Sequence, residues 1–117
     1  MIVKFSITNF GPIRETQTLS FEAEKSEHLE DYYVRNISEH RILKAALIFG
    51  ANASGKTNVL KALDCLRRLA TIPAASKTAP IDCEPFLMDK ESRQKPTEFE
   101  IDFIQNDNLY RYTVRLN

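Results

Sequence analysis

Two glycines, a lysine and a threonine stand close together in the stretch GANASGKTN, residues 50–58. Gly50 and Gly55 are separated by four residues, and Lys56 and Thr57 follow at once. Glycines allow backbone angles that side chains forbid, so amide N–H groups can approach the oxygens of a phosphate. A lysine beside such a loop adds a positive charge, and a threonine hydroxyl is a hard oxygen ligand for Mg²⁺. The spacing therefore predicts a phosphate cradle of the Walker A pattern, GxxxxGK[ST].

The residues on either side of this loop have the patterns of the elements that must position it. The run AALIF, residues 45–49, is apolar throughout and predicts a strand covered on both faces of a mostly parallel sheet. From Gly55 to about Ala70 the apolar residues follow a helical period, which predicts an amphipathic helix with the stripe Val59, Leu60, Leu63, Leu66 and Ala70. A helix N-terminus favours an anion through its unpaired amides and its dipole. The order strand, loop, helix is therefore the order that phosphate binding requires.

From this pattern we expect ATP or ADP to bind together with Mg²⁺. The predicted nucleotide contacts are the whole loop and the start of the helix: Gly50, Ala51, Asn52, Ala53, Ser54, Gly55, Lys56, Thr57 and Asn58. Lys56 is expected at the β- and γ-phosphates, and Thr57 is the predicted metal ligand. No catalytic residue is predicted.

The rest of the chain reads as two β-hairpins, a polar insert and a long loop around that unit, which spans residues 44–70. Alternation of apolar and polar residues predicts antiparallel strands within residues 1–23 and within residues 98–117, the latter turning at QNDN. Residues 24–43 are polar, with Tyr32, Tyr33 and Val34 expected to anchor them to the core. Residues 71–97 contain four of the five prolines and predict a long loop with a short strand around PFLM.

Composition excludes several classes of function. Sixteen basic and sixteen acidic residues cancel, so no global field attracts nucleic acid or an anionic membrane. No stretch approaches the roughly 20 apolar residues of a membrane span, and the N-terminus lacks the pattern of a signal peptide. Cys65 and Cys83 match no metal or redox spacing and are expected to be free thiols, while His28 and His40 are expected to be solvated. We expect a cytoplasmic protein.

The stretches MIVKFSITNFGPI and ANASGKTN together resemble the N-terminal half of the ATP-binding head in ABC-type ATPases of the RecF, SMC and Rad branch. In particular they resemble bacterial AAA-type, OLD-like ATPases of phage-defence and abortive-infection systems. The resemblance implies an α/β fold, the first lobe of a P-loop NTPase, built from antiparallel β-hairpins and a Walker A strand-loop-helix. It covers essentially the whole chain and is specific at residues 5–13 and 47–60. Ala53 departs from it, because many ABC heads have a second glycine there.

Three motifs that the resemblance requires for hydrolysis are missing from the sequence. There is no apolar run ending in Asp-Glu (Walker B), no serine-glycine signature and no switch histidine. Without an acid to position Mg²⁺ and water, most of the barrier lowering in phosphoryl transfer is lost. We therefore expect an incomplete fold, an N-terminal part of an ATPase that binds nucleotide and does not hydrolyse it alone. Nucleic acid is expected as a partner only of a longer protein.

Two other functions remain open at this point. Another P-loop class, such as a small kinase or GTPase, usually has its Walker A strand near the N-terminus, whereas Gly50 comes late here. A non-catalytic interaction module with a vestigial loop is the second alternative. For the incomplete ATPase lobe we expect self-association, by strand addition at an open edge of AALIF or by exchange of the C-terminal hairpin.

Overall fold

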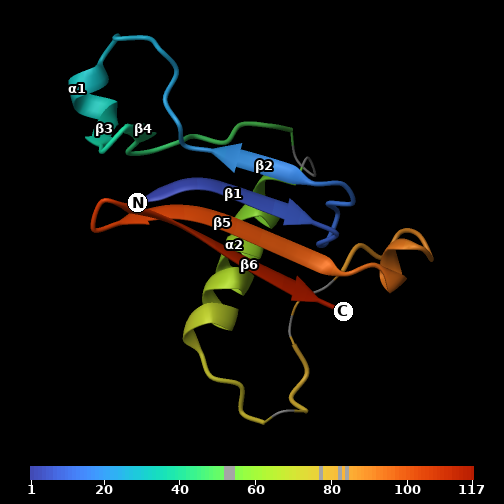
Figure 1. The fold of residues 1–117 in the computed structure, drawn as a ribbon. Helices are drawn as coiled ribbons and strands as arrows, with labels where there is room; N and C mark the ends of the chain where they lie inside the picture. The colour runs from blue at the N-terminus through green and yellow to red at the C-terminus, as the bar shows by residue number, and fades with distance from the viewer. Residues whose placement is uncertain (52–54, 77, 82, 84) are drawn as a thin grey trace.

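The computed structural model in Figure 1 describes residues 1–51, 55–76, 78–81, 83 and 85–117. Its centre is a four-stranded sheet, and one long helix, α2, crosses one face of that sheet. A two-stranded sheet lies beside the N-terminal end of the first strand. All strand pairs among the described residues are antiparallel. The fold is thus mixed α and β, as expected, but without the parallel pairing that the run AALIF predicted.

The larger sheet has the strand order β2-β1-β5-β6, and the smaller one pairs β3 with β4. The elements in chain order are β1 (Ile2–Thr8), β2 (Gln17–Ser20), α1 (Glu30–Tyr33), β3 (Val34–Ile37), β4 (His40–Leu43), α2 (Lys56–Thr71), the 3₁₀ helix η1 (Ser92–Gln94), β5 (Thr97–Gln105) and β6 (Asn108–Leu116).

Alternation along the chain identified the strands of the larger sheet correctly. In β1 the side chains of Val3, Phe5 and Ile7 are buried, and those between them are not. The predicted antiparallel return of β2 onto β1 is confirmed. The predicted C-terminal hairpin is confirmed as well, with β5 and β6 paired from end to end.

Helix α2 packs on the sheet through a face that differs in part from the predicted stripe. Its buried residues are Ala62, Cys65 and Leu66, which pack against Phe5 and Phe99. Leu60 and Ala70 of the predicted stripe are exposed instead. Ala62 and Cys65 are small and only weakly apolar, so a pattern based on large apolar residues does not include them, although both are buried. The buried face is therefore rotated toward Ala62 and Cys65.

Cys65 and Cys83 form a disulfide, so the expectation of two free thiols is wrong. Their Cα atoms lie 6.5 Å apart, within the range that a disulfide spans. A separation of 18 residues gave no hint of this contact in the sequence. The bond links the buried face of α2 to the loop of residues 71–97.

Residues 24–43 contain regular structure that the sequence did not predict. They form the short helix α1 and the hairpin β3–β4, in which Val34 pairs with Leu43. Tyr32 and Tyr33 are exposed at 74% and 54%, so the expectation that they anchor this segment is wrong. The anchor is Ile42, whose fully buried side chain packs with Val3 and Ile104 although the three residues are far apart in the sequence.

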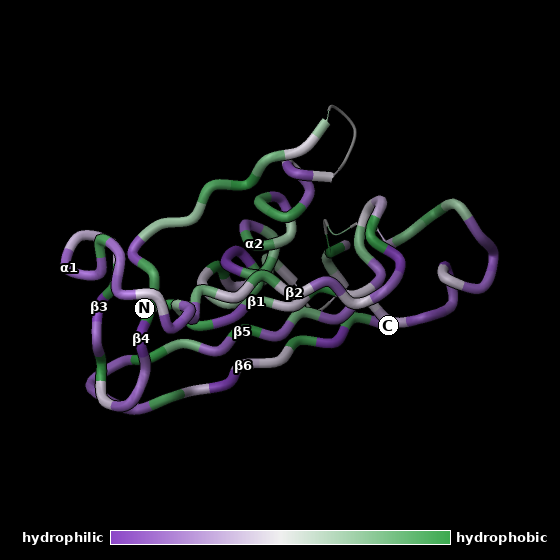
Figure 2. Tube along the Cα trace, turned by 90° about the horizontal axis from the view of Figure 1, so that it is seen from above, coloured by the Kyte–Doolittle hydropathy of each residue, from purple (hydrophilic) through white to green (hydrophobic). Residues whose placement is uncertain are grey.

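Residues 44–50 form no strand, which corrects the prediction for the apolar run. Leu47 and Phe49 are exposed at 81% and 85%. Figure 2 shows this hydrophobic stretch in green, running outside the sheet toward the start of α2. A strand buried on both faces needs neighbouring strands and covering helices, and the described part of the chain gives it neither.

The loop between α2 and β5 is fixed at its C-terminal end by Asn9. The Nδ2 of Asn9 donates to the carbonyl oxygens of Ser92 and Lys95, each at 2.8 Å, and to that of Pro96 at 3.3 Å. Its Oδ1 accepts from the N–H of Phe86 at 3.3 Å. Residues 85–88 form no strand, so the predicted strand around PFLM is wrong. The side-chain amide of Asn9 thus supplies hydrogen bonds to the backbone of this loop, which pairing with another strand would otherwise supply.

A charged cluster lies on the face of the sheet opposite α2. Asp102 is only 6% exposed, and Arg111 donates two hydrogen bonds of 2.7 and 2.9 Å to its carboxylate. Lys4 Nζ lies 3.5 Å from the same carboxylate. The hydrogen bond from Arg111, more than any other contact, holds the pKa of Asp102 below its usual 3.8. Paired in this way, a carboxylate can sit within the sheet at little cost.

This cluster predicts a stability difference that depends on pH. A carboxyl whose pKa is lowered by folding stabilises the protein above the unfolded pKa, and that stability is lost as pH falls through the folded pKa. We expect Asp102→Asn to cost about 1–2 kcal/mol between pH 5 and 7, and the difference from the parent to shrink below about pH 4. Urea unfolding at several pH values measures this. Asp64→Asn is the control, because the half-exposed Asp64 pair with Arg67 should contribute little; an equal loss in both variants would contradict the prediction.

Candidate functional site

The N-cap residue of α2 is Gly55, which has no side chain that could cap the first backbone amides of the helix. Its φ of 91° is left-handed. A Cβ placed on Gly55 would meet nothing within 4 Å, so the glycine is needed for its backbone angle and not for space. An uncapped helix N-terminus is suited to an anion.

Lys56, the first residue of α2, folds back over the beginning of the loop. Its Nζ donates to the carbonyl oxygen of Gly50 and, at 3.3 Å, to that of Ala51. The structure thus brings Gly50, Gly55 and Lys56 together, as the sequence predicted. Asn52, Ala53 and Ser54, which were also predicted to contact nucleotide, lie outside the described residues.

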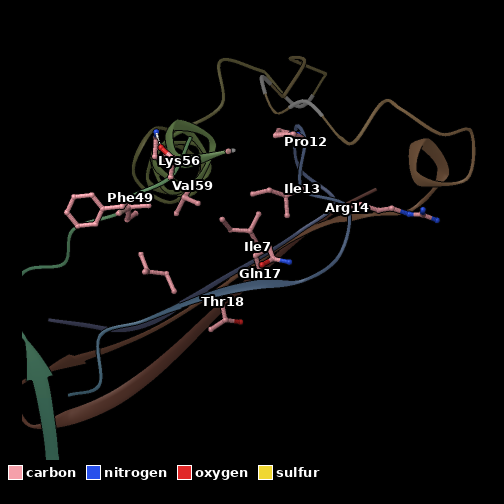
Figure 3. Close-up of a pocket in the computed structure, with 13 residues that line it drawn as sticks. Ile7, Pro12, Ile13, Arg14, Gln17, Thr18, Phe49, Lys56 and Val59 are labelled. Carbon is pink, nitrogen blue, oxygen red and sulfur yellow. Dashed lines mark hydrogen bonds between the residues drawn. The ribbon is translucent and has the colours of Figure 1, made fainter. Parts of the chain in front are cut away.

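A hollow of about 510 Å³ adjoins Lys56. Figure 3 shows Ile7, Ile13 and Val59 pointing into it, with Lys56 at its rim. The side chain of Arg14 points away from Lys56, and its Nε lies 3.2 Å from Asp89. Gln17 of β2 adds a polar group to the lining, whereas the side chain of Thr18 points away from the hollow and its hydroxyl is hydrogen-bonded to that of Ser6 at 2.9 Å. The hollow therefore has an apolar floor with a cation at one edge.

Thr57 and Asn58 do not share this hollow. They line a second one of about 480 Å³ on the other side of the helix start, together with Gly11 and Asp64. Gly11 has a φ of +52°, and a Cβ on it would lie 3.6 Å from Asn58 Oδ1, so the N-terminal turn abuts the first turn of α2. Lys56 and the predicted metal ligand Thr57 therefore line different hollows.

The carboxylate nearest to Thr57 in this second hollow is held by arginines. Asp64 accepts hydrogen bonds from Arg67 at 3.1 and 2.7 Å, and Arg68 Nε lies 3.3 Å away. The hydrogen bond from Arg67 is the main reason that the pKa of Asp64 is lowered. Within the described ranges, no group of three His, Cys, Asp or Glu side chains could hold a metal ion. The residues present thus suit a phosphate, and a Mg²⁺ ion would have to take most of its ligands from that phosphate and from water.

Sequence reasoning missed two residues that line the first hollow. Ile13 and Gln17 come from the turn and strand that follow β1, and they reach the site only because β2 returns antiparallel beside β1. The signal that could have found them was the turn NFGPI, which brings the chain back toward the loop.

Fold and site together define a chain with a GxxxxGKT loop, a helix that begins at its lysine, and an antiparallel sheet beneath that helix. Residues 45–117 match the protein family described as "AAA domain, putative AbiEii toxin, Type IV TA system". The match covers more than half of the chain, so the chain belongs to this AAA-domain family. No curated protein matches the sequence. Among the described residues, no helix is long and apolar enough to cross a membrane.

Proposed function

We propose that this chain binds ATP or ADP, with the phosphates at the N-terminus of α2. The observation that carries the proposal is the meeting of Lys56, the helix N-terminus that begins after Gly55 and the hollow beside them. The carbonyl groups of Gly50 and Ala51 hold the ammonium of Lys56 where a phosphate oxygen can replace them. Membership of the AAA-domain family supports a nucleotide as the ligand.

The remaining contacts follow from the shape of the hollow. Its apolar floor of Ile7, Ile13 and Val59 offers a surface for the flat face of a base, and Gln17 offers hydrogen bonds to a base or a ribose. Asn52, Ala53, Ser54 and Asn58 complete the proposed loop contacts. Thr57 is the proposed ligand of Mg²⁺, which when bound would neutralise phosphate charge.

Calorimetric titration tests this proposal directly. We expect Mg-ATP and Mg-ADP to bind and inorganic triphosphate to compete with them, because the phosphates supply the contact with Lys56. Binding of triphosphate with the same affinity as ATP would show that the hollow takes no part. Absence of binding by all three ligands would refute the proposal.

We further propose that the whole protein is an ATPase of the ABC type, related to the RecF and SMC heads, which acts on DNA or in phage defence. Support comes from the sequence stretches NFGPI and ANASGKTN. Pro12 and Ile13 of the first stretch line the same hollow as Gly55 and Lys56 of the second. Self-association belongs to this proposal, since such heads work in pairs, and the cytoplasm is the proposed location. A zero net charge gives this chain itself no attraction for DNA.

A non-catalytic interaction module is the second candidate, and one observation favours it. Lys56 already has carbonyl partners in the structure, as expected where a loop no longer serves a ligand. The titration above separates the two candidates, because a vestigial loop would leave every nucleotide unbound.

We expect the chain not to turn over ATP, alone or with Mg²⁺. The sequence has no Walker B acid, and Asp102 lies on the far side of the sheet from α2, where Arg111 and Lys4 hold it. Asp82 lies outside the described residues. A phosphate-release assay measures this, and steady release that disappears in Lys56→Ala would contradict it by showing that an acid of this chain activates water.

A further inference from the structure

Strand β6 is a long and regular open edge of the larger sheet. It is nine residues long, forms the outermost strand in Figure 1, and pairs with β5 without a register shift. It contains no proline and no lysine. Edges that stay unpaired are usually short, bulged or guarded by such residues. By contrast, β2 at the other edge has only four residues.

The turn before β6 determines which of its residues face outward. Asn106 and Asp107 both have positive φ, at 50° and 60°, and Gln105 pairs with Asn108 across them. This is a two-residue hairpin turn of the primed type, in which the flanking pair is hydrogen-bonded. The even-numbered residues from Asn108 onward therefore bond to β5. The backbone groups of the odd-numbered ones point away from the sheet: Leu109, Arg111, Thr113 and Arg115.

The two arginines of this edge are already paired within their own sheet. Arg111 binds Asp102, and Arg115 Nε lies 3.2 Å from Glu98. The charge of these arginines is therefore partly neutralised within their own sheet. It would repel a second strand only where an arginine of one strand lies opposite an arginine of the other. Like charges directly opposite each other destabilise a strand pair, so the arginines restrict which pairing is allowed.

One antiparallel pairing of β6 with a second β6 satisfies this restriction over the full strand. Centred on Tyr112, it places Arg111 opposite Thr113 and Arg115 opposite Leu109. Centring on Arg111 instead opposes the two Arg111 side chains, and centring on Thr113 opposes Arg111 to Arg115. All three arrangements use the outward backbone groups, but only the first keeps all arginines apart.

The apolar side of β6 fits the same arrangement. Tyr110 and Tyr112 are 47% and 42% exposed, and Tyr112 lines an apolar groove of about 700 Å³ between the sheet and α2. Pairing centred on Tyr112 brings the two Tyr112 rings together and puts Tyr110 against Val114, while joining the two grooves. Aromatic and β-branched cross-strand pairs of this kind stabilise sheets.

We propose that two copies of this chain form a symmetric dimer through antiparallel β6–β6 pairing centred on Tyr112. The interface is an eight-stranded continuous sheet, made from two four-stranded ones. It is separate from the nucleotide site, because β6 contributes nothing to the hollow beside Lys56. The proposal therefore stands or falls independently of nucleotide binding.

Two substitutions at Thr113 test the interface. Thr113 faces Glu100 within its own chain and Arg111 of the second copy in the dimer. Thr113→Glu should tighten the dimer roughly tenfold, and Thr113→Lys should weaken it roughly tenfold, because each charge meets an arginine twice by symmetry. Within one chain the effects are reversed, since lysine attracts Glu100 and glutamate repels it. If the substitutions acted only through the stability of the single chain, Thr113→Lys would favour the dimer and Thr113→Glu would disfavour it. This is the opposite of the proposed result.

Sedimentation velocity over a hundredfold range of concentration measures association, and amide hydrogen exchange locates it. We expect the amides of Leu109, Arg111 and Thr113 to become protected as concentration rises, with those of Tyr110 and Tyr112 unchanged. A monomer at every concentration, a dimer insensitive to both Thr113 variants, or protection at β2 instead of β6 would each overturn the proposal.

Discussion

Lys56→Ala is expected to abolish the stabilisation that Mg-ATP or Mg-ADP gives the chain, with the fold left nearly intact. Among the described residues the ammonium donates to the carbonyl groups of Gly50 and Ala51 at an exposed site, so its loss removes little packing. At a hundredfold excess of nucleotide over Kd, binding contributes about 2.7 kcal/mol, which raises Tm by about 10 °C in a domain of this size. Thermal unfolding with and without nucleotide measures the difference between parent and variant.

Lys61→Ala is the matched control for this experiment. Lys61 lies on the same helix and is exposed, but it lines the second hollow with Thr57 and not the one beside Lys56. It should keep the full response to nucleotide. A Lys56→Ala variant that responds as the parent does would rule out the proposed role of the lysine, whatever Lys61→Ala does.

Asn9→Ala is expected to destabilise the fold by about 3 kcal/mol, the cost of leaving buried polar groups without their partners. Asn9 is 3% exposed and has a left-handed φ of 55°. Its side chain joins the end of β1 to the loop before β5 through four hydrogen bonds, three donated and one accepted. Urea unfolding measures the loss.

Asn9→Gly separates the two parts of this effect. Glycine loses the same hydrogen bonds but adopts the left-handed angle freely, so it should be about 1 kcal/mol more stable than the alanine variant. Asn36→Ala, at an exposed position of β3, should cost little. A loss at Asn9 no greater than that at Asn36 would contradict the importance given to these hydrogen bonds.

Local patterns in the sequence were enough to find β1, β2, β5 and β6, because alternation reports directly on a sheet with one buried face. The run AALIF misled for the opposite reason. A continuous apolar stretch indicates a strand that needs cover on both faces, but it does not show whether neighbouring strands and helices provide that cover. Here they do not, because Phe49 is exposed. The hairpin β3–β4 was missed because each strand has four residues and only Ile42 is fully buried.

The residue types and spacing of the candidate site could be read from the sequence, but the contacts around the site could not. Gly50, Gly55 and Lys56 are specified by type and spacing, and the structure brings them together. The role of Asn9 depends on partners 77 to 87 residues away, which no local pattern can indicate. The separation of Thr57 from Lys56 depends on the direction in which α2 leaves the loop.

The exposed stretch of residues 44–50 divides the chain into two parts that are interleaved in space. The part before it supplies β1 and β2, and the part after it supplies α2, β5 and β6, yet β1 lies between β2 and β5 in the larger sheet. A protease that cuts beside the exposed Phe49 would therefore nick the chain without releasing either piece, since the β1–β5 ladder and the packing of α2 on Phe5 hold them. Once cut, the chain would behave as a split protein, in which two polypeptides stay associated through the central strands β1 and β5.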